Sequence, residues 1–168
     1  ALFGLAHGAA GDMLAAQALA FDGPMVLAPA MNPRMWANPA TQANIDILLQ
    51  RGAHIVIPAC GGTACGEQGE GRLAPLHDIF LAALRALSPQ DMAGKRVMVT
   101  LGPTREAWDG VRFWSNPSSG LMGAALAVAA WLRGAEVTAV CGPGVRARLP
   151  REITRHDVVS ARDMFQAA

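Results

Sequence analysis

The chain has 168 residues and a formal net charge of +1; 52% of its residues are hydrophobic and 16% are charged. This composition excludes intrinsic disorder and provides enough apolar side chains for one domain or two small ones. The sequence has no clustered run of Lys or Arg, which argues against a nucleic-acid partner. Its longest apolar stretches are shorter than the roughly 20 residues of a membrane span, so no membrane partner is expected either.

Helical and strand-like patterns alternate through the first half of the chain. Apolar residues at a spacing of three and four predict helices, and short apolar runs rich in β-branched residues predict strands. In chain order the predicted elements are a helix at 5–19, a strand at 25–28, a helix at 38–50, a strand at 53–58, a glycine-rich loop at 61–71 and a helix at 76–87.

The pattern stops at a polar, turn-rich segment and then starts again. Residues 89–94 lack periodicity and are predicted to be a linker between a first domain, residues 1–88, and a second domain, residues 95–168. After the linker come a strand at 96–101, a long loop, a helix at 121–133, a strand at 136–140, a short strand at 158–159 and a final helix.

This order of elements predicts the fold class. Strands that alternate with helices imply βαβ units and parallel strand pairing. We therefore expect an α/β protein made of two partial Rossmann-like or flavodoxin-like three-layer domains with mainly parallel sheets.

The ends of the chain and its cysteines predict that it is a fragment of a longer protein and that it is located in the cytoplasm. The sequence begins at Ala1 and ends at Ala168, both within helical patterns, which indicates an internal fragment of a longer protein. Cys60, Cys65 and Cys141 form a sparse, odd-numbered set without a signal peptide, so free thiols and a cytoplasmic location are expected.

A first candidate site follows the strand predicted at 25–28. Ligands of open α/β sheets bind outside the carboxyl ends of the strands, and Asn32 lies there with Met31 beside it. Its amide is suited to donate to and accept from a substrate, with Met35 and Trp36 as an apolar wall. The alternative is that Asn32 caps the next helix while Met31 and Trp36 belong to the core.

The glycine-rich loop is the second part of this candidate site. Its glycines suit a segment that closes over a ligand, its thiol Cys65 is a candidate proton donor or nucleophile, and Arg72 is a candidate anion-binding residue. The alternative for Cys65 is an inert, small apolar side chain. No metal site is predicted, because the cysteines and nearby histidines lack ligand spacing.

Together these motifs resemble a known family. PAMN at 29–32, MW at 35–36 and ACGE-x-G-x-GR at 64–72 are similar to the signature of FMN-dependent cysteine decarboxylases that act on 4′-phosphopantothenoylcysteine. The resemblance implies that Asn32, with Met31 and Arg72, binds the substrate. It also implies that Cys65 donates a proton to the enethiol intermediate formed after decarboxylation, within a loop that closes as a flap. The family's FMN phosphate loop and active-site histidine have no counterpart here, and His7 belongs to a different family segment.

A second candidate site spans residues 97–123. Polar residues follow the strand at 96–101, and Ser118-Ser119-Gly120 precedes a helix, where free backbone N–H groups form an anion site. Arg105 and Arg112 add donors suited to phosphate, although neither the P-loop nor the dinucleotide glycine pattern is present. The alternative is a capped helix with solvent-exposed arginines. The candidate nucleotide- or phosphate-binding residues are Gly102, Thr104, Arg105, Ser118, Ser119 and Gly120.

This second region also resembles a known family. GPTREAWDGVRFWSNPSSGLMG at 102–123, RGAEVTAVCGP at 133–143 and DVVSARDM at 157–164 are similar to the opening of phosphopantothenate–cysteine ligases, which use CTP in bacteria. The resemblance implies that Asn116 and Arg112 act on the acyl-cytidylate intermediate, with Mg²⁺ accompanying CTP. Leu121 departs from the polar residue that is usual there, and the lysine-rich CTP-binding loop of the family is not part of this sequence.

Two signatures in this order resemble the bifunctional enzymes of coenzyme A biosynthesis. The implied function is CTP-dependent ligation of 4′-phosphopantothenate with cysteine, and FMN-dependent decarboxylation of the product, 4′-phosphopantothenoylcysteine, to 4′-phosphopantetheine. The resemblance also implies a homo-oligomer, since decarboxylases of this type use trimeric contacts to build the flavin site and the ligases dimerise. The alternative is a non-catalytic nucleotide- or flavin-binding α/β module. A nucleotide-binding dehydrogenase is disfavoured by the missing glycine fingerprint and acidic ribose partner.

Overall fold

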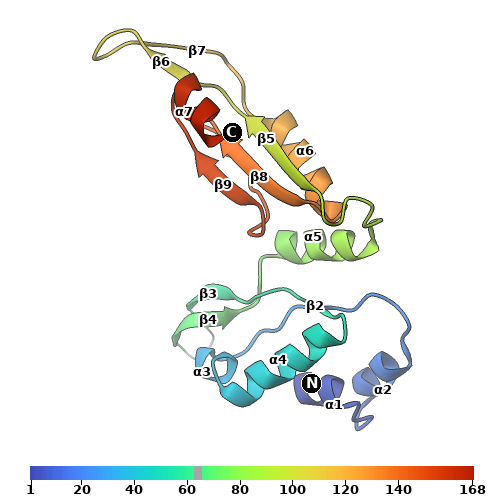
Figure 1. Ribbon diagram of the computed structural model, residues 1–168. Coiled ribbons are helices and arrows are strands. Elements are labelled where there is room, and N and C mark those ends of the chain that lie inside the picture. The colour runs from blue at the N-terminus through green and yellow to red at the C-terminus, as the bar shows by residue number, and fades with distance from the viewer. Residues whose placement is uncertain (63–65) are drawn as a thin grey trace. The chain divides into compact units, whose positions relative to one another are not determined.

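The computed structural model describes residues 1–62 and 66–168. They form two compact units, residues 1–87 and residues 88–168. Each unit combines helices with a parallel strand pairing and one antiparallel hairpin (Figure 1). The predicted α/β class with mainly parallel sheets is confirmed, and the two hairpins are additions to it.

The first unit is built on one short parallel pair. Its elements are α1 (Leu2–His7), α2 (Met13–Ala20), β1 (Val26–Leu27), α3 (Pro33–Trp36), α4 (Pro39–Gln50), β2 (His54–Ile55), β3 (Ala59–Gly62), β4 (Gln68–Arg72) and α5 (Leu76–Leu87). β1 pairs with β2 in parallel, and β3 pairs with β4 antiparallel. Helix α1 packs on α4, where Ala6, Leu48 and Ala53 form a buried cluster. The small alanine side chains allow this close approach.

The helix predicted at 5–19 is divided in two. Gly8 ends α1 in the left-handed conformation, with φ 65°. Asp12 then starts α2, because its side chain accepts a hydrogen bond from the Ala15 N–H at 2.7 Å. Glycine after the last helical residue and aspartate at the N-cap each favour a helix end, and here they override the continuous apolar spacing.

The glycine-rich segment predicted as a loop is a hairpin over most of its described length. Residues 59–62 pair with residues 68–72, with an irregularity between Ala59 and Cys60. Glycine is rare in strands because it adds no side-chain packing. The prediction therefore missed a pairing that backbone hydrogen bonds, rather than apolar side chains, stabilise.

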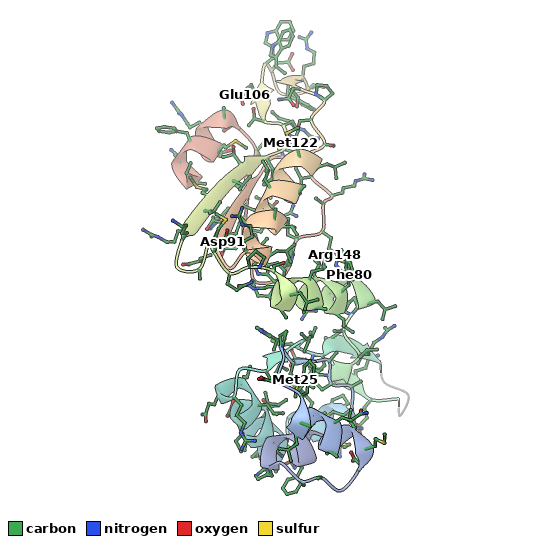
Figure 2. The ribbon with its side chains drawn as sticks, turned by 90° about the vertical axis from the view of Figure 1, so that its right-hand side faces the viewer. Met25, Phe80, Asp91, Glu106, Met122 and Arg148 are labelled. Atoms are coloured by element: carbon green, nitrogen blue, oxygen red, sulfur yellow. The ribbon has the colours of Figure 1, made fainter. Side chains whose placement is uncertain are left out.

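The second unit is a three-stranded parallel sheet with a helix on each face. Its elements are β5 (Arg96–Leu101), β6 (Arg105–Ala107), β7 (Phe113–Ser115), α6 (Leu121–Leu132), β8 (Glu136–Cys141), β9 (Thr154–Asp157) and α7 (Ala161–Ala167). The strand order is β5-β8-β9. Helices α6 and α7 lie on opposite faces of this sheet, and the β6–β7 hairpin projects from its edge (Figures 1 and 2).

The core of this unit surrounds the central strand β8. Val137, Val140 and Cys141 are fully buried, and α6 turns Ala124 and Ala127 toward the sheet. Alanines on this face let the helix backbone approach the strands. Burial raises the pKa of the Cys141 thiol, which keeps it protonated and apolar in character.

The third strand does not lie where the sequence pattern placed it. A short strand was expected at Val158–Val159, but β9 is Thr154–Asp157. All four β9 residues, Thr-Arg-His-Asp, are polar and exposed, so the sequence has no apolar run there that would predict a strand. Val158 and Val159 follow the strand and still take part in hydrogen bonds, since the Val158 N–H donates to the Cys141 carbonyl at 2.9 Å.

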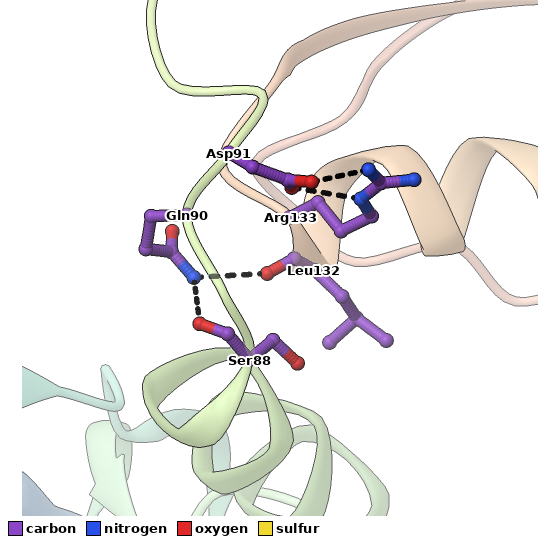
Figure 3. A network of polar contacts seen from close by, with 5 residues as sticks. All are labelled: Ser88, Gln90, Asp91, Leu132 and Arg133. Carbon is purple, nitrogen blue, oxygen red and sulfur yellow. Dashed lines mark hydrogen bonds and ion pairs between the residues drawn. The ribbon is translucent and has the colours of Figure 1, made fainter.

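Residues 88–94, most of which were expected to be a linker, are bonded to the second unit. The Gln90 amide donates to the Leu132 carbonyl at 3.1 Å, and the Met92 N–H donates to the Arg133 carbonyl at 3.0 Å. The Asp91 carboxylate forms a two-point ion pair with the Arg133 guanidinium (Figure 3). Carbonyls at a helix C-terminus lack intrahelical partners, so this segment completes the end of α6.

None of the described helices is long and apolar enough to cross a lipid bilayer.

The Asp91–Arg133 pair predicts a pH dependence of stability. Hydrogen bonds from Arg133 lower the pKa of Asp91 from its usual value of 3.8, so the ion pair stabilises the unit above about pH 3.8 and is lost as the pH falls below that value. Asp91→Asn should reduce the free energy of unfolding at pH 7, and the difference from the wild type should begin to shrink as the pH falls below about 3.8. Urea unfolding followed by tryptophan fluorescence from pH 7 to pH 3 measures this.

Glu152→Gln is the matched control, because Glu152 is an exposed carboxylate of the same unit. It should leave the unfolding curve unchanged at pH 7. A deficit in Asp91→Asn that is as large in acid as at pH 7 would show that the carboxylate charge is not the source of the stabilisation.

Candidate functional site

The turn after β1 places Asn32 at the carboxyl end of the parallel pair. Asn32 is the N-cap of α3, since its Oδ1 accepts a hydrogen bond from the Arg34 N–H at 2.8 Å. Its Nδ2 donates to Glu67 Oε2 at 2.8 Å. The capping alternative is therefore observed, and the same side chain also reaches the β3–β4 hairpin. Trp36 is buried, whereas Met35 is exposed.

The hairpin lies directly against this turn. The Met31 N–H donates to the Gly71 carbonyl at 2.8 Å. A Cβ atom at Gly71 would lie 2.2 Å from the Met31 carbonyl oxygen, a distance that non-bonded atoms do not tolerate. Gly71 therefore permits the backbone contact that brings the PAMN turn and β4 together.

The remaining predicted residues of this site fall in different places. Arg72 is the last residue of β4 and is exposed, and its side chain extends across the hairpin to within 3.5 Å of a Cβ position at Gly61. Cys65 lies outside the described residues. Arg34 and Glu67, which the sequence analysis did not select, form an ion pair with 3.4 Å between Nε and Oε1.

The N-termini of α2, α3 and α4 are poorly suited to a flavin phosphate. Asp12 caps α2, Asn32 caps α3 and Asn38 caps α4, each by accepting a backbone N–H bond. Proline also occupies the first turn of both α3 and α4 and removes a donor. At each of these three ends a side-chain cap therefore occupies a backbone N–H that a phosphate would otherwise bind.

In the second unit, a cavity of about 480 Å³ lies between the end of β5 and the start of α6. Four of the predicted phosphate-binding residues line it: Gly102, Ser118, Ser119 and Gly120. Thr104, Arg105, Arg112 and Asn116 are not among its lining residues. The rest of its wall is mainly apolar and includes Met122 of α6 (Figure 2) and Met164 of α7.

The start of α6 is suited to an anion. Gly120 is its N-cap with φ 74°, and the Ser119 hydroxyl oxygen accepts a long hydrogen bond, 3.4 Å, from the N–H of Leu121, the first helical residue. The first turn contains no acidic residue. The positive end of the helix dipole is therefore not compensated locally. Helix α7 of the same unit differs, because Ser160 and Asp163 close its N-terminus as a capping box.

Asn116 and Thr104 stabilise the backbone that leads to this helix. Asn116 Oδ1 accepts a hydrogen bond from the Ser118 N–H at 2.9 Å. The Ser115 hydroxyl donates to the Thr104 carbonyl at 2.8 Å, which ties the end of β7 to the segment after β5. This bonding leaves the amide N–H₂ of Asn116 on the solvent side of the turn, since the side chain is exposed.

Both candidate arginines lie on the β6–β7 hairpin. Arg112 is paired with Asp109, with 2.5 Å between Nη2 and Oδ2, and its guanidinium lies 4.7 Å from the centre of the Trp108 ring. Arg105 lies 4.7 Å from the centre of the Phe113 ring. Hydrogen bonds from the backbone N–H of Arg112 and other donors of the turn lower the pKa of Asp109.

Sequence reasoning missed the acidic partners of these site residues. Glu67 and Asp109 stand beside Asn32 and Arg112, and Glu106 Oε1 accepts a hydrogen bond from the Ala161 N–H at 2.8 Å. Figure 2 labels Glu106 on the hairpin. The DxxR spacing of Asp109 and Arg112 is a local signal for a turn pair. The other two contacts join segments that are distant in the sequence and leave no such signal.

Within the described ranges, no group of three or more His, Cys, Asp or Glu side chains could hold a metal ion.

The close approach at Gly120 gives a stability prediction. A Cβ atom there would lie 2.8 Å from Val145 Cγ2, and φ is +74°. Gly120→Ala should therefore lower the free energy of unfolding by about 2–4 kcal/mol, the sum of backbone strain and overpacking. Chemical denaturation of the second unit measures the change.

Two further glycines separate the contributions. Gly144 also has a positive φ but open space at its Cβ position, so Gly144→Ala should cost about 1–2 kcal/mol from strain alone. Gly110 has open space and no positive φ, so Gly110→Ala should change stability by less than about 0.5 kcal/mol. Equal losses at Gly120 and Gly144 would contradict the packing contribution.

Comparison with known proteins finds a family match for each unit. Residues 4–87 match the family model described as "Flavoprotein", and residues 92–168 match "DNA/pantothenate metabolism flavoprotein C-terminal domain". The chain is 44% identical over 165 residues to the coenzyme A biosynthesis bifunctional protein CoaBC of Haemophilus influenzae, covering 98% of this chain and 41% of that protein. It is 43% identical to the protein of the same name from Bacillus subtilis, covering 97% and 41%.

Solved structures give local likenesses. The C-terminal domain of a CoaBC protein is 48% identical over 48% of this chain and 40% of that chain, with a TM-score of 0.44. A PPC decarboxylase mutant complexed with pantothenoylaminoethenethiol is 31% identical over 49% of this chain and 46% of that chain, with a TM-score of 0.47.

The chain spans about two fifths of the length of the curated relatives that it matches. Its two family matches follow one another along the chain and together cover nearly all of it. The chain therefore belongs to the flavoprotein family, and along nearly all of its length it is similar to proteins named as bifunctional in coenzyme A biosynthesis.

Proposed function

We propose that the protein catalyses two steps of coenzyme A biosynthesis. One is the CTP-dependent ligation of 4′-phosphopantothenate with cysteine, and the other is the FMN-dependent decarboxylation of 4′-phosphopantothenoylcysteine to 4′-phosphopantetheine. The observation that carries this proposal is that in each unit the family's polar motif directly follows a parallel strand, at the carboxyl end where α/β proteins bind ligands.

In the decarboxylase half, the first unit provides substrate contacts. Asn32 has one N–H of its amide bonded to Glu67 and one remaining for a carboxylate or amide oxygen of the substrate. Arg72 is exposed on β4 and supplies a charge for an anionic group. Cys65 is the proposed proton donor to the decarboxylated intermediate. We propose FMN as the cofactor, with its phosphate held by residues outside the described ones.

In the ligase half, the cavity at the start of α6 is the proposed nucleotide phosphate site. Ser118, Ser119 and the uncompensated N-terminus of α6 offer donors for the phosphates of CTP, which would enter with Mg²⁺. Activation of the 4′-phosphopantothenate carboxylate as an acyl-cytidylate makes it open to attack by the cysteine amine. The exposed amide of Asn116 is the proposed donor to this intermediate, with Arg112 supplying charge.

A homo-oligomer is the proposed assembly. The β6–β7 hairpin exposes four large apolar side chains: Trp108, Val111, Phe113 and Trp114. The rings of Trp108 and Trp114 are stacked, with 5.5 Å between their centres. Large exposed apolar groups of this kind mark interaction surfaces. We place both reactions in the cytosol, in keeping with the free thiols of Cys60 and Cys141.

A non-catalytic nucleotide- or flavin-binding module is the second candidate. The pairing of Arg112 with Asp109 favours it, because a guanidinium that is already neutralised contributes less to stabilising the charge of a reaction intermediate. The two candidates differ in a direct assay, since a binding module takes up ligand without releasing carbon dioxide or pyrophosphate.

The decarboxylase proposal is tested with the protein expressed from its complete coding sequence. It should purify with the visible absorbance of a flavin and release carbon dioxide from 4′-phosphopantothenoylcysteine. Cys65→Ser should retain the flavin and still release carbon dioxide, but formation of 4′-phosphopantetheine should fall by about 10²–10⁴-fold, the usual contribution of a proton donor, and the oxidised enethiol intermediate should accumulate and be detectable by mass spectrometry.

Cys60→Ser is the matched control, because Cys60 is an exposed thiol of β3 in the same segment. It should keep normal activity. A colourless protein without carbon dioxide release would contradict the decarboxylase proposal, and equal losses in both variants would contradict the specific role of Cys65.

The ligase proposal is tested with Asn116→Asp. The new carboxylate can still accept the Ser118 N–H bond that shapes the turn, but it places a negative charge beside the proposed acyl-cytidylate phosphate. Ligation, measured as pyrophosphate release with CTP, should fall at least about 100-fold, while decarboxylation and the melting temperature stay unchanged. Ligation at the wild-type rate would remove Asn116 from the proposed site.

A further inference from the structure

We propose that Glu67 is a positioning residue that fixes the orientation of the Asn32 amide and thereby aims its second N–H at the ligand. The inference deepens the proposed decarboxylase function and rests on it for the identity of the ligand. It adds a residue of the β3–β4 hairpin that neither the motif reading nor the comparisons assign to this role.

The two polar ends of Asn32 have different, complementary partners. Its Oδ1 accepts from the Arg34 N–H at 2.8 Å, and its Nδ2 donates to Glu67 Oε2 at 2.8 Å. A rotation of the amide by 180° would put oxygen against a carboxylate and N–H₂ against a backbone N–H. Both contacts would then be repulsive, so the pair of partners selects one orientation.

Glu67 is itself held in place. Arg34 Nε lies 3.4 Å from Glu67 Oε1, on the oxygen that does not bond Asn32. Gly69, two residues along the chain, approaches Pro33 so closely that a Cβ atom would lie 2.9 Å from the Pro33 Cβ. Glu67 lies in the turn just before β4, and the close approach of Gly69 to Pro33 brings this part of the hairpin against the turn that carries Asn32.

The consequence is a directed donor. A side-chain amide nitrogen has two N–H groups, and the Glu67 bond uses one of them. Within the described part of the chain, the other is available for an acceptor oxygen at the carboxyl end of β1, where the substrate carboxylate or amide is proposed to bind. A charged acceptor such as Glu67 also polarises the amide, which strengthens donation by the second N–H.

A double-mutant cycle on the protein expressed from its complete coding sequence tests this. Glu67→Ala should raise the KM for 4′-phosphopantothenoylcysteine about tenfold, as expected for the loss of one hydrogen bond to a charged group, with kcat changed less than about threefold. Glu67→Gln keeps an acceptor and should recover most of the loss. In an Asn32→Ala background, Glu67→Ala should have less than about a twofold effect.

Glu70→Ala is the matched control, because it removes an exposed carboxylate from the same hairpin. It should leave KM unchanged. If Glu67→Ala raises KM by the same factor with and without Asn32, then Glu67 acts through the hairpin and not through the amide, and the inference is wrong.

A second readout does not depend on activity. With ¹⁵N-asparagine labelling, the Nδ2 proton of Asn32 bonded to Glu67 should give a downfield, slowly exchanging signal. Glu67→Ala should move it upfield and accelerate its exchange, while Glu67→Gln and Glu70→Ala preserve it. A signal unaffected by Glu67→Ala overturns the inference, whatever the assays show. A signal that responds, in a protein without decarboxylase activity, upholds the positioning and refutes only the proposed function.

Discussion

The register between β5 and β8 runs in parallel from Arg96 opposite Glu136 to Leu101 opposite Cys141. Because the strands point the same way, the chain leaves both of them at one edge of the sheet, and α6 must cross back between them. The turn into α6 is thereby placed beside the end of β5. The β1–β2 pair does the same for the PAMN turn over only two residues. Both candidate sites depend on this geometry.

Glycines allow the loops at these strand ends to make close backbone contacts. Gly71 allows the Met31 N–H to bond β4, and a Cβ atom at Gly142 would lie 1.6 Å from the Pro103 carbonyl oxygen. In each unit, the loop that carries the site residues is thus held by backbone close to another strand end, rather than by large side chains. Such sites gain rigidity without filling the space that a ligand needs.

The sequence predicted the elements with strong periodicity. The strand at Arg96–Leu101 and the helices at Pro39–Gln50 and Leu76–Leu87 lie where apolar spacing placed them. It missed the two hairpins, because β3 and β4 consist largely of glycine and polar residues and β6 and β7 are exposed on every residue. Motif reasoning selected Asn32 and the Ser118–Gly120 turn as candidate site residues, and these assignments stay predictions. It did not find Glu67, since the contact with Asn32 joins two distant segments and no local pattern encodes it.

The central position of β8 has a consequence for how the second unit opens. In the described sheet, β8 is bonded along both edges, whereas β5 and β9 each pair with β8 alone. Its buried Val137 and Val140 amides are therefore released only when the whole sheet separates, while β9, polar and exposed on all four residues, can detach by itself. Amide exchange in this unit should accordingly form a hierarchy, with β8 reporting global unfolding and the β9 edge reporting local fraying that leaves the start of α6 intact.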